Sequence, residues 1–156
     1  MSTRLRSEIK QSRPFASPAE EAFLNLLRTA AALEHALEEG LKEHGVTGTQ
    51  YNVLRILRGA GPAGLCRNEV KERMITPVPD ATRLLDRLEQ AGLVERRRET
   101  DDRRFVTARI TGRGLDLLDR LELPISRLHE RHLGHLSVAE LQHLSELLER
   151  AREATA

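Results

Sequence analysis

At 156 residues, the chain has the length of one domain and is long enough to bury a hydrophobic core. Hydrophobic residues make up 39% of it and charged residues 31%, and the absence of any run of about 18 apolar residues excludes a transmembrane helix. Cys66 is the single cysteine, which excludes an intrachain disulfide, and no apolar segment follows the N-terminal charges as it does in a secretory signal. We therefore expect a protein of the reducing cytoplasm that has no membrane partner.

The positive charge of the chain is concentrated in one segment. The whole sequence carries a net charge of only +1, whereas the residues from Val94 to Arg113 include seven arginines and four acids and carry +3. A local basic field of this kind is typical of a nucleic-acid contact. An arginine-rich pair of solvated strands would have the same composition.

Two helices are predicted in the first 60 residues. Ser17, with a proline after it and Glu20 three residues on, has the spacing of a helix start. The helix that follows carries an apolar stripe at steps of three and four and is expected to end near Gly45. Thr47 and Gln50 repeat the capping spacing and open a second helix, which the glycine-rich segment 59–64 ends.

Residues 66–92 predict a helix-turn-helix. A short helix is expected over 66–74, and Pro77 and Pro79 prevent it from continuing. We expect Thr76 to cap the next helix, with Pro77 in its first position, and Gly92 to end it. Helix-turn-helix elements place their second helix in the major groove of DNA, so this segment points to a DNA-binding protein.

A hairpin and two further helices are predicted after residue 92. A strand that begins at Leu93, a polar turn at 99–103 and a return strand over 105–110 form the hairpin. Thr111 opens a long helix in which Pro124 should cause a kink or a local adjustment, and Ser137 opens the last helix. The apolar stripes of the first helix and of the last two exceed what the small hairpin lobe can cover. They predict a homodimer, with a monomeric bundle as the alternative.

Three motifs follow one another along the chain: TRLLDRLEQAGLVER at 82–96, DDRR at 101–104 and ITGRG at 110–114. In this order they resemble the recognition helix, wing and exit helix of the MarR (multiple antibiotic resistance regulator) family of winged-helix transcription factors. TGTQYNVLRIL at 47–57 is similar to a further landmark of that family. The resemblance covers nearly the whole chain from Ser17 onward.

The resemblance implies a mainly α fold, an α+β winged helix-turn-helix with about six helices and a small β-hairpin wing. It implies one domain over 1–156 and an intertwined homodimer, in which 1–45 and 112–156 form the dimerisation part and 46–111 form the DNA-binding lobe. The implied function is that of a transcriptional regulator, and more narrowly a repressor. Such a protein binds a pseudo-palindromic operator in double-stranded DNA and is released by a small phenolic or lipophilic effector.

By position, the resemblance implies a set of DNA-binding residues at the start of the recognition helix and at the wing: Pro77, Val78, Pro79, Asp80, Thr82, Arg83, Arg87, Arg103 and Arg104. Arg104 is expected in the minor groove, and Asp102 is expected to pair with an arginine and hold the wing. Arginine suits this work because its planar guanidinium binds phosphate with two N–H groups and is attracted to a narrow groove of negative potential.

Residues 77–80 depart from the family, which usually has small polar or basic residues here. Val78 could contact a thymine methyl group, and Asp80 could accept a hydrogen bond from a cytosine amino group. Alternatively, Asp80 is a first-turn residue favoured by the helix dipole, and its charge repels phosphate.

Other candidate sites are less specific. Tyr51 and Arg55 lie one turn apart in the helix that lines the ligand cavity of the family, so they are candidate ligand-binding residues; a packed tyrosine beside an exposed arginine is the alternative. For Cys66 we favour an inert buried thiol over a redox sensor. For His129, His132 and His135 we favour solvated or interface positions over a metal site, because zinc needs three or four converging ligands.

The sequence contains no catalytic triad, phosphate-binding loop or paired-carboxylate motif, so we expect neither an enzyme nor a cofactor. The competing function is a winged-helix module that binds other proteins, in which Asp80 and the prolines prevent base readout. Salt-dependent binding to duplex DNA distinguishes the two functions.

Overall fold

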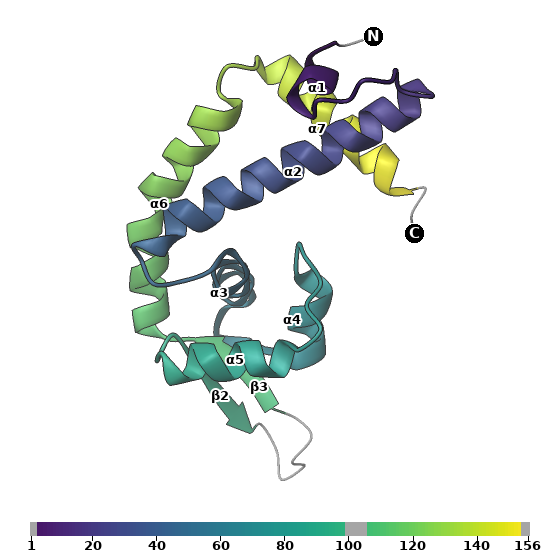
Figure 1. Cartoon of the computed structure of the whole chain (residues 1–156). Helices are drawn as coiled ribbons and strands as arrows, with labels where there is room; N and C mark the ends of the chain where they lie inside the picture. Colours follow the sequence, from purple (N-terminus) through teal and green to yellow (C-terminus); the bar gives the residue numbers. More distant parts are fainter. Residues whose placement is uncertain (1–2, 99–105, 154–156) are drawn as a thin grey trace.

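The computed structural model describes residues 3–98 and 106–153, which form seven α-helices, a single-turn 3-10 helix and three short strands. In chain order these are α1 Thr3–Glu8, α2 Pro18–Lys42, α3 Gly48–Ala60, the 3-10 helix Gly61–Ala63, β1 Leu65–Cys66, α4 Arg67–Arg73, α5 Ala81–Gln90, β2 Val94–Arg98, β3 Val106–Ile110, α6 Gly112–Leu133 and α7 Val138–Glu153. Figure 1 shows a lobe of α3, α4, α5 and the sheet at one end, from which the long helices α2 and α6 run to α1 and α7 at the other. The expected winged helix-turn-helix fold is confirmed.

The helix starts predicted at four capping residues, Ser17, Thr47, Thr111 and Ser137, are confirmed. The Ser17 hydroxyl accepts a hydrogen bond from the backbone N–H of Glu20 at 3.1 Å, and Thr111 accepts one from Gly114 at 3.1 Å. Thr47 and Gln50 form a complete capping box, in which each side chain accepts from the other residue's backbone N–H. These bonds satisfy amide groups that a helix leaves unpaired at its first turn.

The start of α5 differs from the prediction. The helix begins at Ala81 with Asp80 as its cap, rather than at Pro77 with Thr76 as its cap. The reason is local: a residue that precedes a proline is driven out of the helical region, and Val78 precedes Pro79. At its other end α5 stops as expected, because Gly92 adopts a φ of 70° and Leu93 N–H bonds back to the Leu88 carbonyl.

The sheet has three strands in the order β1-β3-β2 rather than the two of the predicted hairpin. The additional strand, β1, pairs Leu65 with Ala108 and Cys66 with Thr107. Two residues are too few for any alternating pattern, so the sequence carried no signal for this strand. Gly64 permits the pairing: its φ is 68°, and a Cβ there would lie 2.5 Å from the Ala108 carbonyl oxygen.

The hydrophobic core lies in the lobe and at the adjoining ends of α2 and α6. Its fully buried side chains come from α2, α3, α4, α5, α6 and β2, and include Leu41, Leu54, Leu57, Leu88 and Leu121. Helix α6 runs through Pro124 without a break and curves along its length, so the expected interruption is a bend within one helix (Figure 1).

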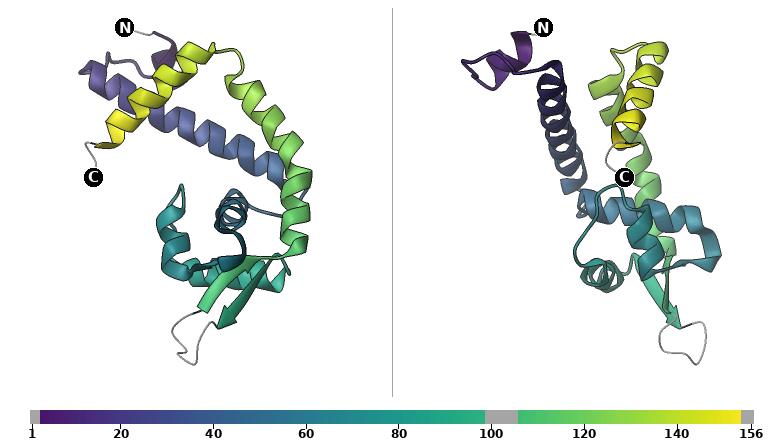
Figure 2. Two further views of the ribbon diagram at one scale, coloured as in Figure 1. Left: turned by 180° about the vertical axis from the view of Figure 1, so that it is seen from behind. Right: turned by 90° about the vertical axis from the view of Figure 1, so that its right-hand side faces the viewer.

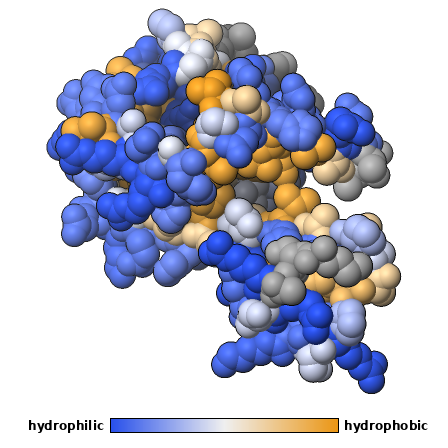
Figure 3. Space-filling model, turned by 90° about the horizontal axis from the view of Figure 1, so that it is seen from above, coloured by the Kyte–Doolittle hydropathy of each residue, from blue (hydrophilic) through white to orange (hydrophobic). Residues whose placement is uncertain are grey.

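The N-terminal half of α2 and the whole of α7 expose many of their apolar side chains. Phe23 is 61% exposed, Leu27 is 55% exposed and Leu147 is 45% exposed, and α7 contributes no buried residue. Figure 3, which looks down on the molecule from above, shows apolar side chains at the surface between hydrophilic ones. Within one chain, the apolar stripe of these helices therefore stays largely uncovered.

Residues 3–16, where no helix was predicted, contain the short helix α1. Leu5 and Phe15 are buried, and Glu8 at the end of α1 bonds to Arg4 and to Arg28 of α2, each at 3.0 Å. These two bonds lower the pKa of the Glu8 carboxyl. The N-terminal arm is thus packed onto α2.

Candidate nucleic-acid interface and neighbouring pocket

Helix α5 buries one face and exposes the other. Ala81, Leu85 and Leu88 are buried, whereas Arg83 and Arg87 are exposed and, four residues apart, lie on the same side of the helix. This division follows from the sequence pattern and leaves two arginines available to an external partner.

The segment before α5 is divided in the same way. Pro77 and Pro79 are exposed, while Val78 is half-buried and packs against the hydrophobic core. The Asp80 carboxylate accepts a hydrogen bond from the Arg83 N–H at 2.9 Å. Of the two roles considered for Asp80, the helix-start role is therefore present in the free protein.

Thr82 lies beside a residue that the sequence did not single out. The Arg67 guanidinium, at the start of α4, donates a hydrogen bond to the Thr82 hydroxyl at 3.3 Å. Arg67 is exposed and Thr82 is half-buried, so an arginine of α4 joins the exposed surface of α5. The sequence did contain a signal for Arg67: it lies at the start of a short predicted helix, and phosphate contacts often come from helix starts.

Arg96 of β2 turns back toward α5. Its Nη2 lies 2.6 Å from Asp86 Oδ1 and 2.6 Å from Glu89 Oε2, and its Nε donates to Glu89 Oε2 at 2.9 Å. The hydrogen bonds from Arg96 lower the pKa of the Glu89 carboxyl, and the same contacts raise the pKa of the guanidinium. One arginine of the basic segment is thus held by two acids of the chain.

The remaining charges of β2 are more exposed. Arg97 lies 3.0 Å from Glu95, and Arg98, at the end of the strand, is exposed. Asp102, Arg103 and Arg104, expected at the wing tip, lie outside the described residues. Both views in Figure 2 show the β2–β3 hairpin at the end of the lobe that is far from α1 and α7.

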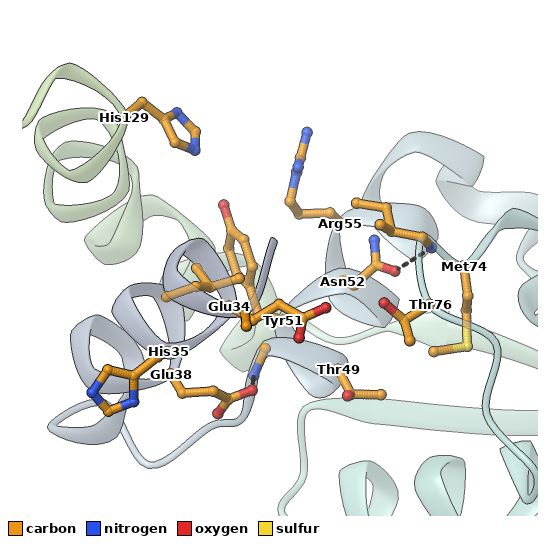
Figure 4. Close-up of a pocket in the computed structure, with 14 residues that line it drawn as sticks. Glu34, His35, Glu38, Thr49, Tyr51, Asn52, Arg55, Met74, Thr76 and His129 are labelled. Carbon is orange, nitrogen blue, oxygen red and sulfur yellow. Dashed lines mark hydrogen bonds between the residues drawn. The ribbon is translucent and has the colours of Figure 1, made fainter. Parts of the chain in front are cut away.

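A pocket of about 530 Å³ lies on the other side of the lobe, between α2, α3, α6 and the segment after α4. Tyr51 and Arg55 both line it, and the Arg55 guanidinium lies 5.8 Å from the centre of the Tyr51 ring. Figure 4 shows His129 of α6 across the opening from these two residues, and Glu34 of α2 close to Tyr51. Basic, acidic and phenolic groups therefore share the pocket.

The wall of this pocket is connected to the start of α5. The side-chain oxygen of Asn52 accepts a hydrogen bond from the Ile75 N–H at 3.0 Å, and Met74, Ile75 and Thr76 all line the pocket. On the opposite wall, Glu38 accepts a hydrogen bond from the Gly48 N–H at 2.8 Å (Figure 4). The polypeptide that leads into α5 is thus one side of the cavity.

Cys66 is half-buried rather than buried as expected. Its backbone N–H bonds to Glu69 at 2.8 Å, and hydrogen bonds from that N–H and from the thiol lower the pKa of the Glu69 carboxyl.

The three clustered histidines have different surroundings. His129 faces the pocket, His132 is half-buried and His135 is exposed. Within residues 3–98 and 106–153, no group of three or more His, Cys, Asp or Glu side chains is arranged to hold a metal ion. In the same residues, no helix combines the length and apolar character needed to cross a membrane.

Comparison with protein families gives a match to the MarR family over residues 44–104. YkoM of Bacillus subtilis, described as an uncharacterized HTH-type transcriptional regulator, is 32% identical over 137 residues, which cover 84% of this chain and 86% of YkoM. The HTH-type transcriptional repressor IacR of Pseudomonas putida is 27% identical, with 81% of this chain and 75% of IacR covered.

Solved structures give the same result. A MarR transcription factor from Planctomyces limnophilus is 41% identical, with a TM-score of 0.69 and coverage of 87% of this chain and 98% of that one. PcaV of Streptomyces coelicolor, solved with its natural ligand, is 27% identical with a TM-score of 0.69 and coverage of 90% and 95%. MepR of S. aureus, solved in complex with DNA, shares the fold at 20% identity, with a TM-score of 0.75 and coverage of 83% and 96%.

Proposed function

This chain belongs to the MarR family of winged-helix transcriptional regulators, and we propose that it is a repressor that binds a pseudo-palindromic operator as a homodimer. The observation that carries the proposal is the exposed face of α5, where Arg83 and Arg87 stand beside a basic hairpin. Two relatives support it, since IacR is called a repressor and MepR was solved in complex with DNA.

The DNA-binding surface that we propose comprises α5, the segment before it and the hairpin. Arg83 and Arg87 would enter the major groove with α5, and Arg67 would add a phosphate contact from α4. Arg103 and Arg104 would contact the backbone and the minor groove from the wing. Pro77, Val78, Pro79, Asp80 and Thr82 complete the proposed set, with Val78 contributing to packing as well.

The dimer that we propose uses residues 1–45 and 112–156, and residues 46–111 form the DNA-binding lobe. The uncovered apolar side chains of α2 and α7, among them Phe23, Leu27 and Leu147, support this division. A dimer places two lobes on two half-sites about one helical turn (~34 Å) apart, which doubles the number of contacts to DNA.

The pocket of Tyr51 and Arg55 is the effector site that we propose. A phenolic or carboxylic ligand would pair its anionic group with Arg55 and stack or hydrogen-bond with Tyr51. Because residues 74–76 form one wall, a ligand there would displace the segment that leads into α5. PcaV supports the proposal as a relative of the same fold that was solved in complex with its natural ligand.

The decisive experiment for DNA binding is a salt titration. The purified protein is first used to select sequences from random duplexes, and its affinity for the selected duplex and for an unrelated one is then measured over a range of salt. A regulator that neutralises several phosphates loses affinity steeply as salt rises, with a log–log slope of about −0.9 for each phosphate. A protein-interaction module would show no duplex affinity at any salt.

The effector is sought by screening phenolic and lipophilic acids for release of the selected duplex. We expect Arg55→Gln to lower the response to anionic compounds while leaving duplex affinity in their absence unchanged, because Arg55 lies in α3 and no residue of α5 lines its pocket. A response that is equally strong in Arg55→Gln and in the unsubstituted protein would place the effector elsewhere.

A further inference from the structure

Arg96 connects the hairpin to α5 through both its side chain and its backbone. Besides the contacts of the guanidinium to Asp86 and Glu89, the backbone N–H of Arg96 donates to Glu89 Oε1 at 3.2 Å. Asp86 and Glu89 are three residues apart and so lie on one side of α5. We call Arg96, Asp86 and Glu89 the clamp.

The clamp does not contribute positive charge to the surface. Its single arginine is balanced by two carboxylates, so the three residues together carry −1, and the Arg96 side chain is only 28% exposed. A guanidinium that already bonds two acids has few donors left for phosphate. Arg96 therefore differs from Arg98, which is exposed at the end of the same strand.

Beside the buried core residues Leu85, Val94 and Ala108, the packing between α5 and the sheet is incomplete at the level of Arg96. A hollow of about 400 Å³ lies between α5 and the sheet, lined by Thr82 and Leu85 of α5, by Val106 of β3 and by Arg96 itself. Side chains that face a hollow lose the contacts that would resist rotation of one element against the other. The charged hydrogen bonds of the clamp add directional contacts between α5 and the hairpin, and such bonds are stronger than those between neutral groups.

We infer that Arg96 is a positioning residue that sets the angle of the hairpin relative to α5, so that the helix and the hairpin can enter adjacent grooves of one operator together. The inference rests on the proposed DNA-binding function. Arg96 pairs with Ala108 in the sheet, and the hairpin continues beyond it to Arg98 paired with Val106. A rotation of the hairpin at Arg96 therefore displaces the Arg98–Val106 pair relative to α5.

The test compares Arg96→Gln with Arg98→Gln in the full-length protein. We expect Arg96→Gln to lower affinity for the selected duplex by about tenfold or more, as much as losing one base contact costs, while affinity for an unrelated duplex stays unchanged. Arg98→Gln should instead lower the salt slope by about one on both duplexes, as the loss of a phosphate contact does.

A second variant, Glu89→Gln, tests whether Arg96 acts through the clamp or contacts DNA itself. If Arg96 acts through the clamp, Glu89→Gln should reproduce the loss of preference for the selected duplex. If Arg96 itself contacts DNA, removing the acid should free the guanidinium and raise affinity. Thermal melting of each variant excludes a general loss of the fold, which would lower affinity for both duplexes alike and could not change their ratio.

Two results would overturn the inference: an unchanged ratio of the two affinities in Arg96→Gln, or a rise in affinity in Glu89→Gln. They are distinct from failure of the proposed function, which would show as no salt-dependent duplex binding by the unsubstituted protein. In that case the inference falls with the function on which it rests.

Discussion

The carboxylate of Asp80 accepts a hydrogen bond from the backbone N–H of Arg83 at 2.9 Å, so an exposed acid caps the first turn of α5. Helix caps of this kind satisfy an amide that would otherwise bond water, and they fix where the helix begins. An acid at this place also sets a negative charge beside the exposed Arg83.

Substitutions at Asp80 should separate its two effects. Asparagine caps helices as well as aspartate does, so Asp80→Asn should leave the free energy of unfolding nearly unchanged, whereas Asp80→Ala should lower it by about 1 kcal/mol. Asp80→Asn should raise affinity for duplex DNA of any sequence, because it removes a charge that repels phosphate. A loss of affinity confined to sites with one particular cytosine would show instead that Asp80 reads that base.

The junction between β3 and α6 depends on Gly114. A Cβ there would lie 2.5 Å from the Leu93 carbonyl oxygen and 2.6 Å from Ile110 Cγ1, whereas one at Gly112 would meet nothing within 4 Å. Gly114→Ala should therefore lower the free energy of unfolding by about 1–3 kcal/mol, the range for overpacking a filled site. Gly112→Ala is the matched control and should be neutral or slightly stabilising. Chemical denaturation of both variants checks this, and equal stabilities would contradict it.

The proposed dimer can be tested on α7. Leu147 is 45% exposed in one chain, so Leu147→Glu should leave the fold intact and dissociate the dimer, because a partner would have to bury the new charge. Gln142→Glu, an exposed polar position on the same helix, is the control. Sedimentation and circular dichroism give mass and helix content, and removal of the chain from Ser137 onward should also yield monomer. A Leu147→Glu protein that remains a dimer would show that α7 lies outside the interface.

The wing assignment rests on Arg104, which the family resemblance places at the minor groove. We expect Arg104→Ala to weaken binding to the selected duplex and to lower the salt slope by about one, since a cationic contact to DNA is lost. The mass of the protein in sedimentation should not change. If both affinity and slope match those of the unsubstituted protein, Arg104 makes no contact with DNA.

The lowered pKa of Glu89 predicts a dependence of stability on pH. A carboxyl whose pKa is lower in the folded protein stabilises the fold above its unfolded pKa of about 4.3, and this contribution is lost as the pH falls through the folded value. The difference in unfolding free energy between the unsubstituted protein and Glu89→Gln should thus be largest near neutral pH and shrink in acid. Glu8, Glu69 and Glu140, whose pKa values are also lowered, are present in both proteins and cancel in the difference. A difference that is constant with pH would contradict the prediction.

Elements with local signals were predicted well from the sequence. Ser17, Thr47 and Thr111 each supply a hydroxyl within three residues of the amide that it accepts, so the helix starts depend on neighbours in the chain alone. The end of α5 at Gly92 belongs to the same class, because it requires only a residue that tolerates positive φ.

Elements that depend on distant partners were predicted poorly. Strand β1 exists because Leu65 pairs with Ala108 and Cys66 pairs with Thr107, more than 40 residues away along the chain. A strand of two residues has no sequence pattern from which that pairing could be predicted. One error had a local cause instead: the start of α5 was predicted four residues too early, because the capping rules gave weight to Thr76 and underrated the effect of Pro79 on Val78.

The sequence by itself determined the family, the order of the helices and the buried and exposed faces of α5, since these follow from periodicity, capping and motif order. Only the tertiary structure decided which arginines are available to a partner. Arg96 and Arg98 are two residues apart in one basic run, yet one is held by Asp86 and Glu89 of α5 and the other is exposed. The physical reason is that an arginine is available to a partner only if the fold brings no acid within hydrogen-bonding distance of it. A count of charges along the chain does not give those distances.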